Sequence, residues 1–411
     1  MRVLLVSGYR AGAFGGIGRE TAELGAGLCA GGCEVGLLAN ASPAPLAGVR
    51  RFPLDVPIRD SARTQLAEAV RAFAPDVVHL VGAGAKLVRI AGDALTTVPW
   101  LLTVHCVPPS EQHCGCWFGH NRLHYGMRNL RSVPSSMAWR WLMRRGRFAA
   151  VICHSEVVVS QLRHAGCAAG KIRLIPFGCR PGPKAASTGG AGLFEGDDCP
   201  RIVSVGGMSH TKGFHDYLKV VGGLLGRYPR VRYCIVGAAR YGDYERYLRR
   251  QVSRLGLEGH VVIAVDAEES ARTASCRAAD LYVQPSHEEG FCLSFMEAAL
   301  MCPRLLGTRT GAMPEVASVD PAIRLVTPGD VAGLAEASAS LLAQDVPVDW
   351  KQRRSVALAQ RFATSGYQAA HLRVYADAAS AAERRSGPPA GLSSGIDRTP
   401  SAGVATPRVR A

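Results

Sequence analysis

Short apolar runs alternate with amphipathic stretches along most of this 411-residue chain, and the alternation runs through the chain twice. A chain of this length is too long for one ordinary hydrophobic core, so two domains are expected. Short buried runs separated by amphipathic helices are typical of parallel α/β sheets. The pattern therefore predicts two copies of one architecture, each a parallel sheet covered by helices.

The expected strands of the first half are Val3–Ser7, Glu34–Leu38, Val77–Leu80, Trp100–Val104, Ala150–Cys153 and Ile172–Ile175. Helices lie between them, for example Arg19–Ala30 and Glu156–His164. The expected strands of the second half are Arg201–Val205, Arg232–Val236, His260–Ile263, Leu281–Val283 and Arg304–Gly307. A helical stretch from Trp350 to Ala382 follows them.

Composition shifts set the expected domain boundaries. Residues 1–183 form the first domain, and the Pro-, Gly- and Ser-rich residues 184–199 form a linker. Residues 200–365 form the second domain. Residues 366–382 form a helix that crosses back to the first domain, and residues 383–411 are predicted to be a disordered tail because they are rich in Pro, Gly, Ser and Arg.

The formal net charge of +15 favours an anionic partner, such as a nucleotide phosphate, an anionic membrane surface or a nucleic acid. The 13 cysteines are scattered and odd in number, which fits reduced thiols in the cytoplasm better than a disulfide framework. No apolar run reaches the roughly 18 to 20 residues of a membrane-spanning helix. The expected location is cytoplasmic, with peripheral contact to the cytosolic face of a membrane left open.

Ligands of parallel sheets bind beyond the carboxyl ends of the strands, where helix N-termini offer N–H groups to phosphate. The loop after the first strand carries Gly15 and Gly16, whose backbone can approach an anion closely. In the second half, Gly206 and Lys212 follow the strand ending at Val205. A lysine there can neutralise a diphosphate, although a solvated loop lysine is the simpler interpretation when the residue is taken alone.

The segment from Gln284 to Ala299 carries the most information. Glu289 lies in a loop, and Glu297 lies eight positions later, inside the helix that the loop begins. A carboxylate at the second position suits ribose hydroxyls, and the N–H groups of the first turn suit a phosphate. That turn comprises Gly290, Phe291, Cys292 and Leu293. Two ordinary surface glutamates on an amphipathic helix are the alternative interpretation.

His105 follows the apolar strand Trp100–Val104, so it is placed to contact a substrate at the same edge of the first sheet. A single histidine of this kind is more often structural. Its candidacy therefore depends on the other motifs.

Taken in order, these motifs resemble retaining glycosyltransferase family 4, the glycosyl transferases group 1, from Met1 to about Ala382. The most specific part is Pro285–Ala299 followed by Gly311–Val316. Pro75–His79, Thr103–His105, Val151–Ser155, Ile175–Gly178 and Ala279–Val283 support it. The resemblance implies a GT-B fold, in which two Rossmann-like domains with parallel sheets face each other across a cleft.

The resemblance also implies an activity and a site. The family transfers a sugar from a nucleotide sugar with retention and without a metal, so no cofactor is expected. By matching positions, Glu289 contacts the donor sugar, Glu297 the ribose and Lys212 the diphosphate. His105 lies near the reaction centre, and Gly15 and Gly16 face the donor phosphates and the acceptor. The N-terminal domain takes the acceptor, and the C-terminal domain takes a UDP-sugar or, as second choice, a GDP-sugar.

Four positions depart from the family pattern. Gly207 replaces an arginine, which removes one cation from the expected phosphate site, and Cys292 replaces a glycine in the turn before the helix. Cys302 replaces the usual glycine before Pro303, and Ala312 replaces the second of two glycines that precede Pro314. A non-catalytic member that binds nucleotide sugar is therefore one alternative function, and a GT-B epimerase or phosphorylase is another.

Two further features leave alternatives open. Residues 105–124 are rich in cysteine and histidine, but Cys114 and Cys116 are spaced more tightly than in structural zinc sites, so an acceptor-side or plain surface loop is favoured. Residues 119–180 hold ten arginines and one lysine against the single acid Glu156. Such a segment suits an anionic membrane, an anionic acceptor or a solvated basic helix, whereas no nucleic-acid module is present.

Overall fold

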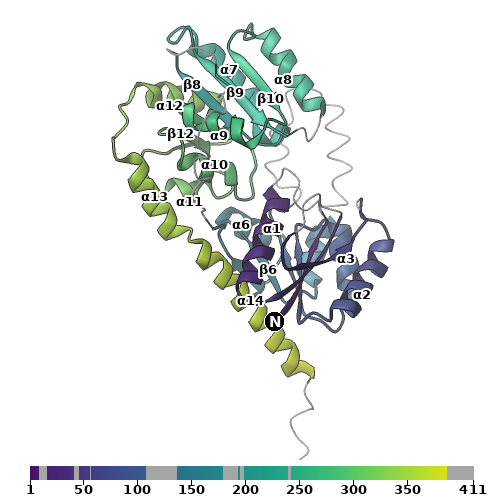
Figure 1. Cartoon of the computed structure of the whole chain (residues 1–411). Coiled ribbons are helices and arrows are strands. Elements are labelled where there is room, and N and C mark those ends of the chain that lie inside the picture. The colour runs from purple at the N-terminus through teal and green to yellow at the C-terminus, as the bar shows by residue number, and fades with distance from the viewer. Residues whose placement is uncertain are drawn as a thin grey trace, which may run out of the picture.

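The computed structural model describes residues 1–8, 16–40, 46–55, 57–107, 137–178, 193–194, 199–238 and 242–386. Within these ranges the chain forms two Rossmann-like α/β domains, as predicted, stacked one above the other in Figure 1. Every strand pairing in the two sheets is parallel. The strand orders are β3-β2-β1-β4-β5-β6-β7 and β10-β9-β8-β11-β12-β13.

The N-terminal sheet consists of β1 (Arg2–Ser7), β2 (Glu34–Ala39), β3 (Val49–Pro53), β4 (Val77–Val81), β5 (Trp100–Thr103), β6 (Ala150–Cys153) and β7 (Ile172–Leu174). The C-terminal sheet consists of β8 (Arg201–Val205), β9 (Arg232–Gly237), β10 (Val261–Val265), β11 (Leu281–Gln284), β12 (Leu305–Thr308) and β13 (Arg324–Val326). The central strands of both sheets are almost wholly buried, because helices cover both faces of each sheet.

Among the described residues, the N-terminal domain contains the helices α1 (Gly16–Ala30), α2 (Ser61–Phe73), α3 (Ala85–Ala94) and α6 (Glu156–His164), a helical segment over residues 137–145, and the 3-10 turn η1 (Ala169–Lys171). Those of the C-terminal domain are η2 (His210–Lys212), α7 (Phe214–Leu224), α8 (Gly242–Arg254), α9 (Glu269–Ala278), α10 (Leu293–Ala299), α11 (Met313–Ala317) and α12 (Val331–Ala343). None of the described helices is long and apolar enough to cross a bilayer.

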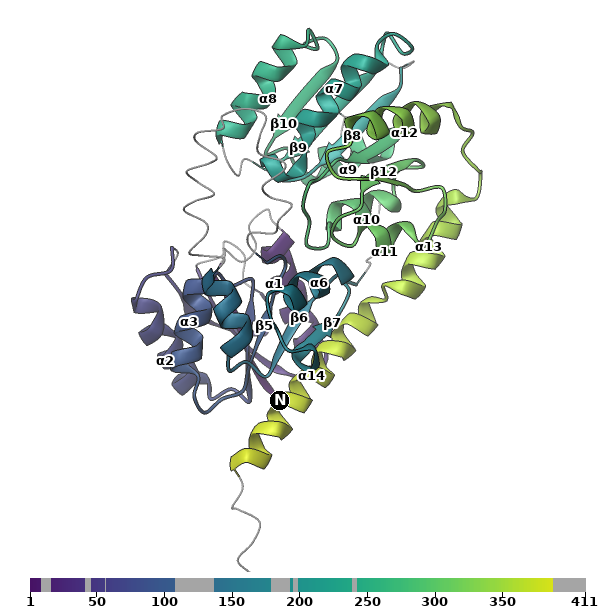
Figure 2. The same cartoon turned by 180° about the vertical axis from the view of Figure 1, so that it is seen from behind.

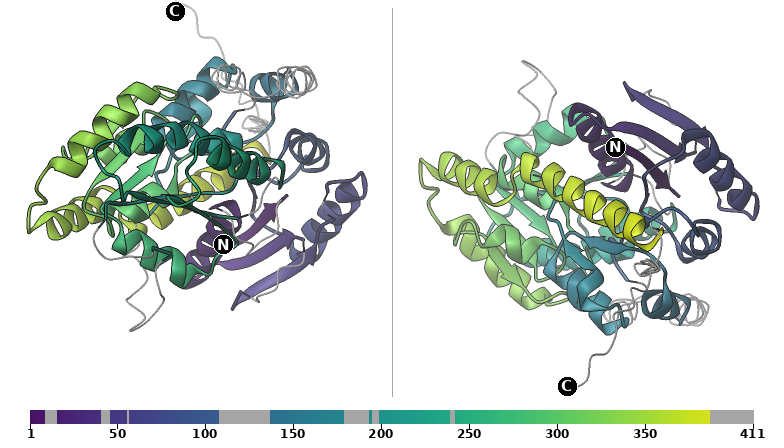
Figure 3. Two further views of the ribbon diagram at one scale, coloured as in Figure 1. Left: turned by 90° about the horizontal axis from the view of Figure 1, so that it is seen from above. Right: turned by 90° about the horizontal axis from the view of Figure 1, so that it is seen from below.

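Two helices lead from the C-terminal domain back to the first. Helix α13 (Trp350–Arg361) lies against the C-terminal domain, and α14 (Thr364–Ser386) continues along the N-terminal one (Figures 1 and 2). The view from below shows α14 running under that domain (Figure 3). The Tyr375 hydroxyl lies 2.7 Å from Nδ1 of His79 in β4, and the ring of Tyr367 stacks on Phe177 at 5.3 Å. These buried contacts fasten α14 to the N-terminal sheet.

The structure differs from the sequence prediction in three places. Strands β3 and β13 were not predicted; they are the edge strand of one sheet and a three-residue edge strand of the other. The predicted helix 350–382 is interrupted at Phe362 and Ala363, and the ring of Phe362 packs edge-on against Phe291. The predicted tail begins too early, because α14 continues to Ser386. Most of the predicted linker and residues 387–411 lie outside the described residues.

Candidate active site

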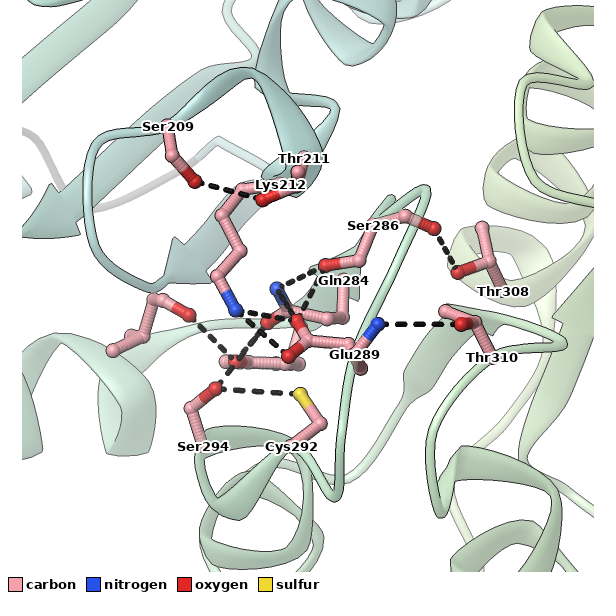
Figure 4. Close-up of polar contacts among 12 residues, drawn as sticks. Ser209, Thr211, Lys212, Gln284, Ser286, Glu289, Cys292, Ser294, Thr308 and Thr310 are labelled. Carbon is pink, nitrogen blue, oxygen red and sulfur yellow. Dashed lines mark hydrogen bonds and ion pairs between the residues drawn. The ribbon is translucent and has the colours of Figure 1, made fainter. Parts of the chain in front are cut away.

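Two loops at the carboxyl edge of the C-terminal sheet meet around Glu289. Lys212 lies in η2, which follows β8, and Glu289 lies in the loop that follows β11. Because β8 and β11 are neighbours in the sheet, these loops converge. The Lys212 Nζ lies 2.7 Å from both carboxylate oxygens of Glu289, and Figure 4 shows the ammonium pointing directly at the carboxylate. Sequence reasoning placed both residues in one site, and the structure brings them into contact.

The Glu289 carboxylate is held by further donors. The Ser286 hydroxyl donates to Oε1 at 2.7 Å, and the Gln284 amide reaches the same oxygen at 3.4 Å. The backbone N–H of Glu289 donates to the Thr310 hydroxyl at 3.3 Å. The residue is 7% exposed, so these partners replace water around a buried charge. Sequence reasoning did not single out Ser286 or Gln284.

Two glycines let backbone segments approach this cluster closely. A Cβ atom on Gly311, whose φ is +56°, would lie 2.6 Å from the Glu289 Cβ. A Cβ atom on Gly206 would lie 3.4 Å from Cδ and Cε of Lys212, so Gly206 forms the surface along which the lysine chain extends. Gly206 therefore shapes the site through packing.

His105 approaches Glu289 from the other domain. A Cβ atom on Gly290 would lie 2.3 Å from the His105 carbonyl oxygen, so only glycine fits at this point. The Ser155 hydroxyl, at the start of α6, donates to the Gly290 carbonyl at 2.7 Å. Phe291 packs against Phe177 of the N-terminal domain with ring centroids 5.3 Å apart. Gly290 and Phe291 thus bring the two domains into direct contact next to Glu289.

The turn before α10 has an unusual backbone. Cys292 is the N-cap of α10 and adopts φ +76° and ψ +66°, a left-handed conformation that glycine adopts without strain. This explains why a glycine is the usual family residue at the position. Burial and the neighbouring Glu289 raise the pKa of the Cys292 thiol, so it is neutral at physiological pH. Leu293 begins α10, and a Cβ atom on Gly16 would lie 3.9 Å from its Cδ1. Gly15 lies outside the described residues.

Glu297 lies farther along α10, between two arginines. Its Oε1 lies 2.5 Å from Nη1 of Arg19 in α1, and its Oε2 lies 3.2 Å from Nη1 of Arg272 in α9. The Arg19 contact joins the two domains. A small pocket beside Glu297 is lined by Val205, Arg272, Thr273, Cys276, Ser294 and Met301. Gly207 stands where the family pattern has an arginine, so the expected phosphate site lacks that cation. The structure instead places the guanidinium groups of Arg19 and Arg272 next to Glu297.

Glu20 and His154 were also missed from the sequence. They contact each other and His105. His154 follows β6, the neighbour of β5, so the strand-end rule that selected His105 would have selected it too. Glu20 lies inside α1 and carried no such signal.

The Cys/His-rich segment and the basic segment are only partly described. Cys106 is exposed, and residues 108–136 lie outside the described residues. Residues 137–145 are helical. Trp139, Leu142 and Met143 are buried there, whereas Trp141 is 54% exposed. Some apolar side chains of this helix therefore pack in the core, whereas Trp141 lies on the surface.

Comparison with known families identifies both halves of the chain. Residues 192–361 match the family described as glycosyl transferases group 1, and residues 14–181 match the one described as Glycosyltransferase Family 4.

Among characterised proteins, the phosphatidyl-myo-inositol mannosyltransferase of Mycobacterium leprae is 27% identical over 363 residues, covering 84% of this chain and 88% of that protein. The 2-deoxystreptamine N-acetyl-D-glucosaminyltransferase of Niallia circulans is 23% identical over 144 residues, and the D-inositol 3-phosphate glycosyltransferase of Segniliparus rotundus is 32% identical over 152. These two matches cover 35% of this chain and only about a third of those enzymes, 36% and 33%.

Solved structures share the fold over nearly the whole chain. Sucrose-phosphate synthase from Thermosynechococcus elongatus has a TM-score of 0.73 at 17% identity, covering 93% of this chain and 100% of that one. Anabaena HepE in complex with UDP-glucose has a TM-score of 0.66 at 19% identity, with the same coverage. These likenesses confirm the predicted GT-B fold.

Proposed function

This chain belongs to the glycosyl transferases group 1, family 4, and from that membership we propose that it is a retaining, metal-independent glycosyltransferase that uses a nucleoside diphosphate sugar. The observation that carries the proposal is the contact between Lys212 and Glu289. Glu289 lies just before α10, and Glu297 lies eight residues later, inside that helix. His105 of the other domain contacts the neighbouring Gly290. A cation and helix N–H groups beside a buried carboxylate suit a sugar diphosphate whose leaving group gains negative charge.

In the proposed reaction, the bond between the anomeric carbon and the diphosphate oxygen breaks while the acceptor oxygen bonds to the same face of the sugar. The acceptor proton passes to the departing phosphate oxygen. Lys212 stabilises the charge on that leaving group. Glu289 accepts hydrogen bonds from Lys212, Ser286 and Gln284, so it is better placed to orient sugar hydroxyls than to attack carbon. Closure of the cleft would exclude water from the reaction.

We favour a UDP-sugar as donor, with a GDP-sugar second. The HepE structure of the same fold holds UDP-glucose, which supports the first choice. For the acceptor, the names of the three related enzymes mention phosphatidyl-myo-inositol, inositol phosphate or deoxystreptamine. All three contain a polyhydroxylated cyclohexane ring, so a cyclitol hydroxyl on a lipid or a soluble molecule is the first acceptor to test. Polysaccharide intermediates belong in the same screen.

The donor site is tested by thermal unfolding of the protein with UDP, GDP, ADP or TDP, in EDTA. A nucleotide at 100 times its dissociation constant should add about 2.7 kcal/mol of stability. Glu297→Ala should weaken that nucleotide at least tenfold, because hydrogen bonds to a charged group contribute about 1.5–3 kcal/mol. Glu269→Ala is the matched control, since it removes the other carboxylate on Arg272 and leaves Glu297 in place.

Each outcome of this experiment selects a function. Stabilisation by one nucleotide names the donor base for a transfer assay with cyclitol acceptors. Stabilisation without transfer to any acceptor favours the non-catalytic alternative, and conversion of the nucleotide sugar without acceptor favours an epimerase. No stabilisation by any nucleotide contradicts the proposed donor site.

We also propose a cytoplasmic enzyme that contacts an anionic membrane through residues 137–145. None of the ten cysteines among the described residues forms a disulfide, in keeping with a reducing compartment. Met137 and Trp141 are 66% and 54% exposed one helical turn apart, and Arg140 and Arg145 are exposed beside them. Exposed apolar side chains flanked by arginines suit the headgroup region of a bilayer.

Pelleting with vesicles of phosphatidylglycerol and phosphatidylcholine measures this contact. Each surface arginine contributes about 1 kcal/mol of attraction to an anionic membrane, so Arg140→Gln with Arg145→Gln should weaken binding about 30-fold. Arg246→Gln with Arg250→Gln on α8 is the control, because it removes the same charge from exposed positions of the other domain. Equal losses in both pairs would indicate nonspecific attraction and contradict the assignment.

A further inference from the structure

A buried carboxylate lies directly behind His105. Glu20 of α1 has a fully buried side chain, and its Oε1 lies 2.9 Å from Nε2 of His154. Its Oε2 lies 3.1 Å from Nε2 of His105, whose side chain is 20% exposed. The Tyr367 hydroxyl of α14 donates to Oε1 at 3.4 Å. Elements from four parts of the sequence thus converge on one carboxylate.

The hydrogen bonds of His154 require an extra proton. Its Nδ1 lies 2.7 Å from the carbonyl oxygen of Ile175, which only accepts, and its Nε2 faces Glu20. A neutral imidazole has one N–H and cannot donate to both partners. Burial raises the pKa of Glu20, but the facing His105 and His154 outweigh burial and lower it to about 2. The proton therefore belongs to the ring, and the pair is an imidazolium and a carboxylate.

The second oxygen of Glu20 faces the reaction centre. Glu20 Oε2 and His105 Nε2 have no aligned hydrogen-bond partner among the described residues, although they lie 3.1 Å apart and both are buried. Each is therefore the available partner of the other, and a small rotation of the His105 ring completes the bond. The opposite side of His105, its backbone, contacts Gly290 in the donor loop. Glu20 can thus control His105 without touching the donor-binding residues Lys212 and Glu297.

We propose that Glu20 is a positioning residue for sugar transfer: it forms an ion pair with His154 and uses its other oxygen to fix the His105 ring against the donor loop. This role rests on the proposed glycosyltransferase function, and it concerns residues of this chain that lie outside the donor motif. The arrangement works only while His154 keeps both ring protons, because loss of one proton breaks either the Ile175 or the Glu20 contact.

Burial keeps several ionisable groups around the cluster neutral at physiological pH. The titratable side chains that face the cluster are Tyr367, His371 and Tyr375 of α14, His79 of β4 and Glu23 of α1. Burial lowers the pKa of His371 to about 4 and that of His79 well below its usual value, so both are neutral above pH 6. Burial raises the pKa of both tyrosines well above 10. Burial lowers the pKa of His105 as well, so none of these groups accounts for a decline of activity on the alkaline side.

The substitution Glu20→Gln removes the negative charge of the side chain and keeps its size and shape nearly unchanged. The new side-chain amide donates a hydrogen bond to a neutral His154 while its oxygen faces His105, so the contacts with both histidines survive without the extra proton. We expect Glu20→Gln to lose the decline of kcat on the alkaline side. We expect Glu20→Ala, which removes the contact with His105, to lower kcat about 100-fold at every pH with donor nucleotide binding unchanged.

Two measurements test the proposal on the whole protein. Nitrogen-15 NMR of histidine-labelled protein should show a ring with both nitrogens protonated in the wild type, and this signal should be absent from Glu20→Gln and His154→Gln. The pH dependence of kcat is then compared among the wild type, Glu20→Gln and the control Tyr375→Phe, which removes a buried hydrogen bond to His79 on the same interface. The control should keep the wild-type profile.

The outcomes separate this proposal from the proposed function. Absence of transfer in the wild type contradicts the function, whereas the NMR signal does not depend on activity. A wild-type pH profile in Glu20→Gln, or a donor affinity that falls as much as kcat in Glu20→Ala, contradicts the positioning role. A carboxylate and two imidazoles within 4.8 Å of one another also form a zinc donor set. One equivalent of bound zinc that is needed for turnover would overturn the ion pair.

Discussion

Lys212→Ala is expected to lower kcat about 100- to 1,000-fold, the usual effect of removing one preorganised group that stabilises charge in a transition state. The Lys212 ammonium contacts both oxygens of Glu289, and in the proposed reaction it stabilises the departing diphosphate. Its loss removes the cation for the leaving group and leaves a buried carboxylate without its ion-pair partner. Steady-state kinetics with the donor found by thermal unfolding measures the effect.

Lys219 provides the matched control. It also pairs with a carboxylate, Asp216, at 2.9 Å, but it lies on the exposed surface of α7 with a side chain 56% exposed. Lys219→Ala removes the same charge from the same domain, and we expect kcat to change less than twofold because exposed ion pairs contribute little. Comparable losses of kcat in the two variants would indicate an effect of net charge and would contradict the proposed role of Lys212 in stabilising the leaving group.

The contrast between Lys212 and Glu20 shows what a sequence can predict about such a site. Lys212 and Glu289 each follow a strand, and loops that follow neighbouring parallel strands must meet at one edge, so their contact follows from topology. Glu20 lies inside a helix and acquires its partners only when β5, β6 and α14 assemble around it. Residues whose role depends on tertiary packing leave no periodic signal in the chain.

The same distinction applies to the fold. The buried central strands were predicted because they are continuous apolar runs. Strand β3 was missed because it is an edge strand whose Arg50 and Arg51 are exposed, and β13 has only three residues. The break between α13 and α14 has no glycine or proline to mark it. It occurs where Phe362 turns toward Phe291, a contact between segments 71 residues apart in the sequence.

Asp320→Ala is expected to destabilise the C-terminal domain by about 3–5 kcal/mol, because it leaves a buried guanidinium without its counter-ion. Arg354 of α13 has a side chain 1% exposed and lies 2.8 Å from Asp320 through both Nε and Nη2. Burial lowers the pKa of Arg354 even with Asp320 in place, so the charge is costly to keep here without a partner. Thermal unfolding should show a midpoint lower by about 6 to 20 °C.

Two further variants isolate the cause. Asp349→Ala removes a carboxylate that pairs with the adjacent Arg353, but both side chains are more than half exposed, so a loss of at most about 1 kcal/mol is expected. Combining Asp320→Ala with Arg354→Met removes the unpaired charge and should recover part of the stability. If Asp320→Ala alone were as mild as Asp349→Ala, the buried pair would not be what holds α13 in place. Arg354 also donates to the carbonyls of Ala299, the last residue of α10, and of Cys302 and Pro303, which follow it. Loosening Arg354 would therefore disturb α10 and α14 together, and we expect transfer activity to decrease already at temperatures below the unfolding midpoint.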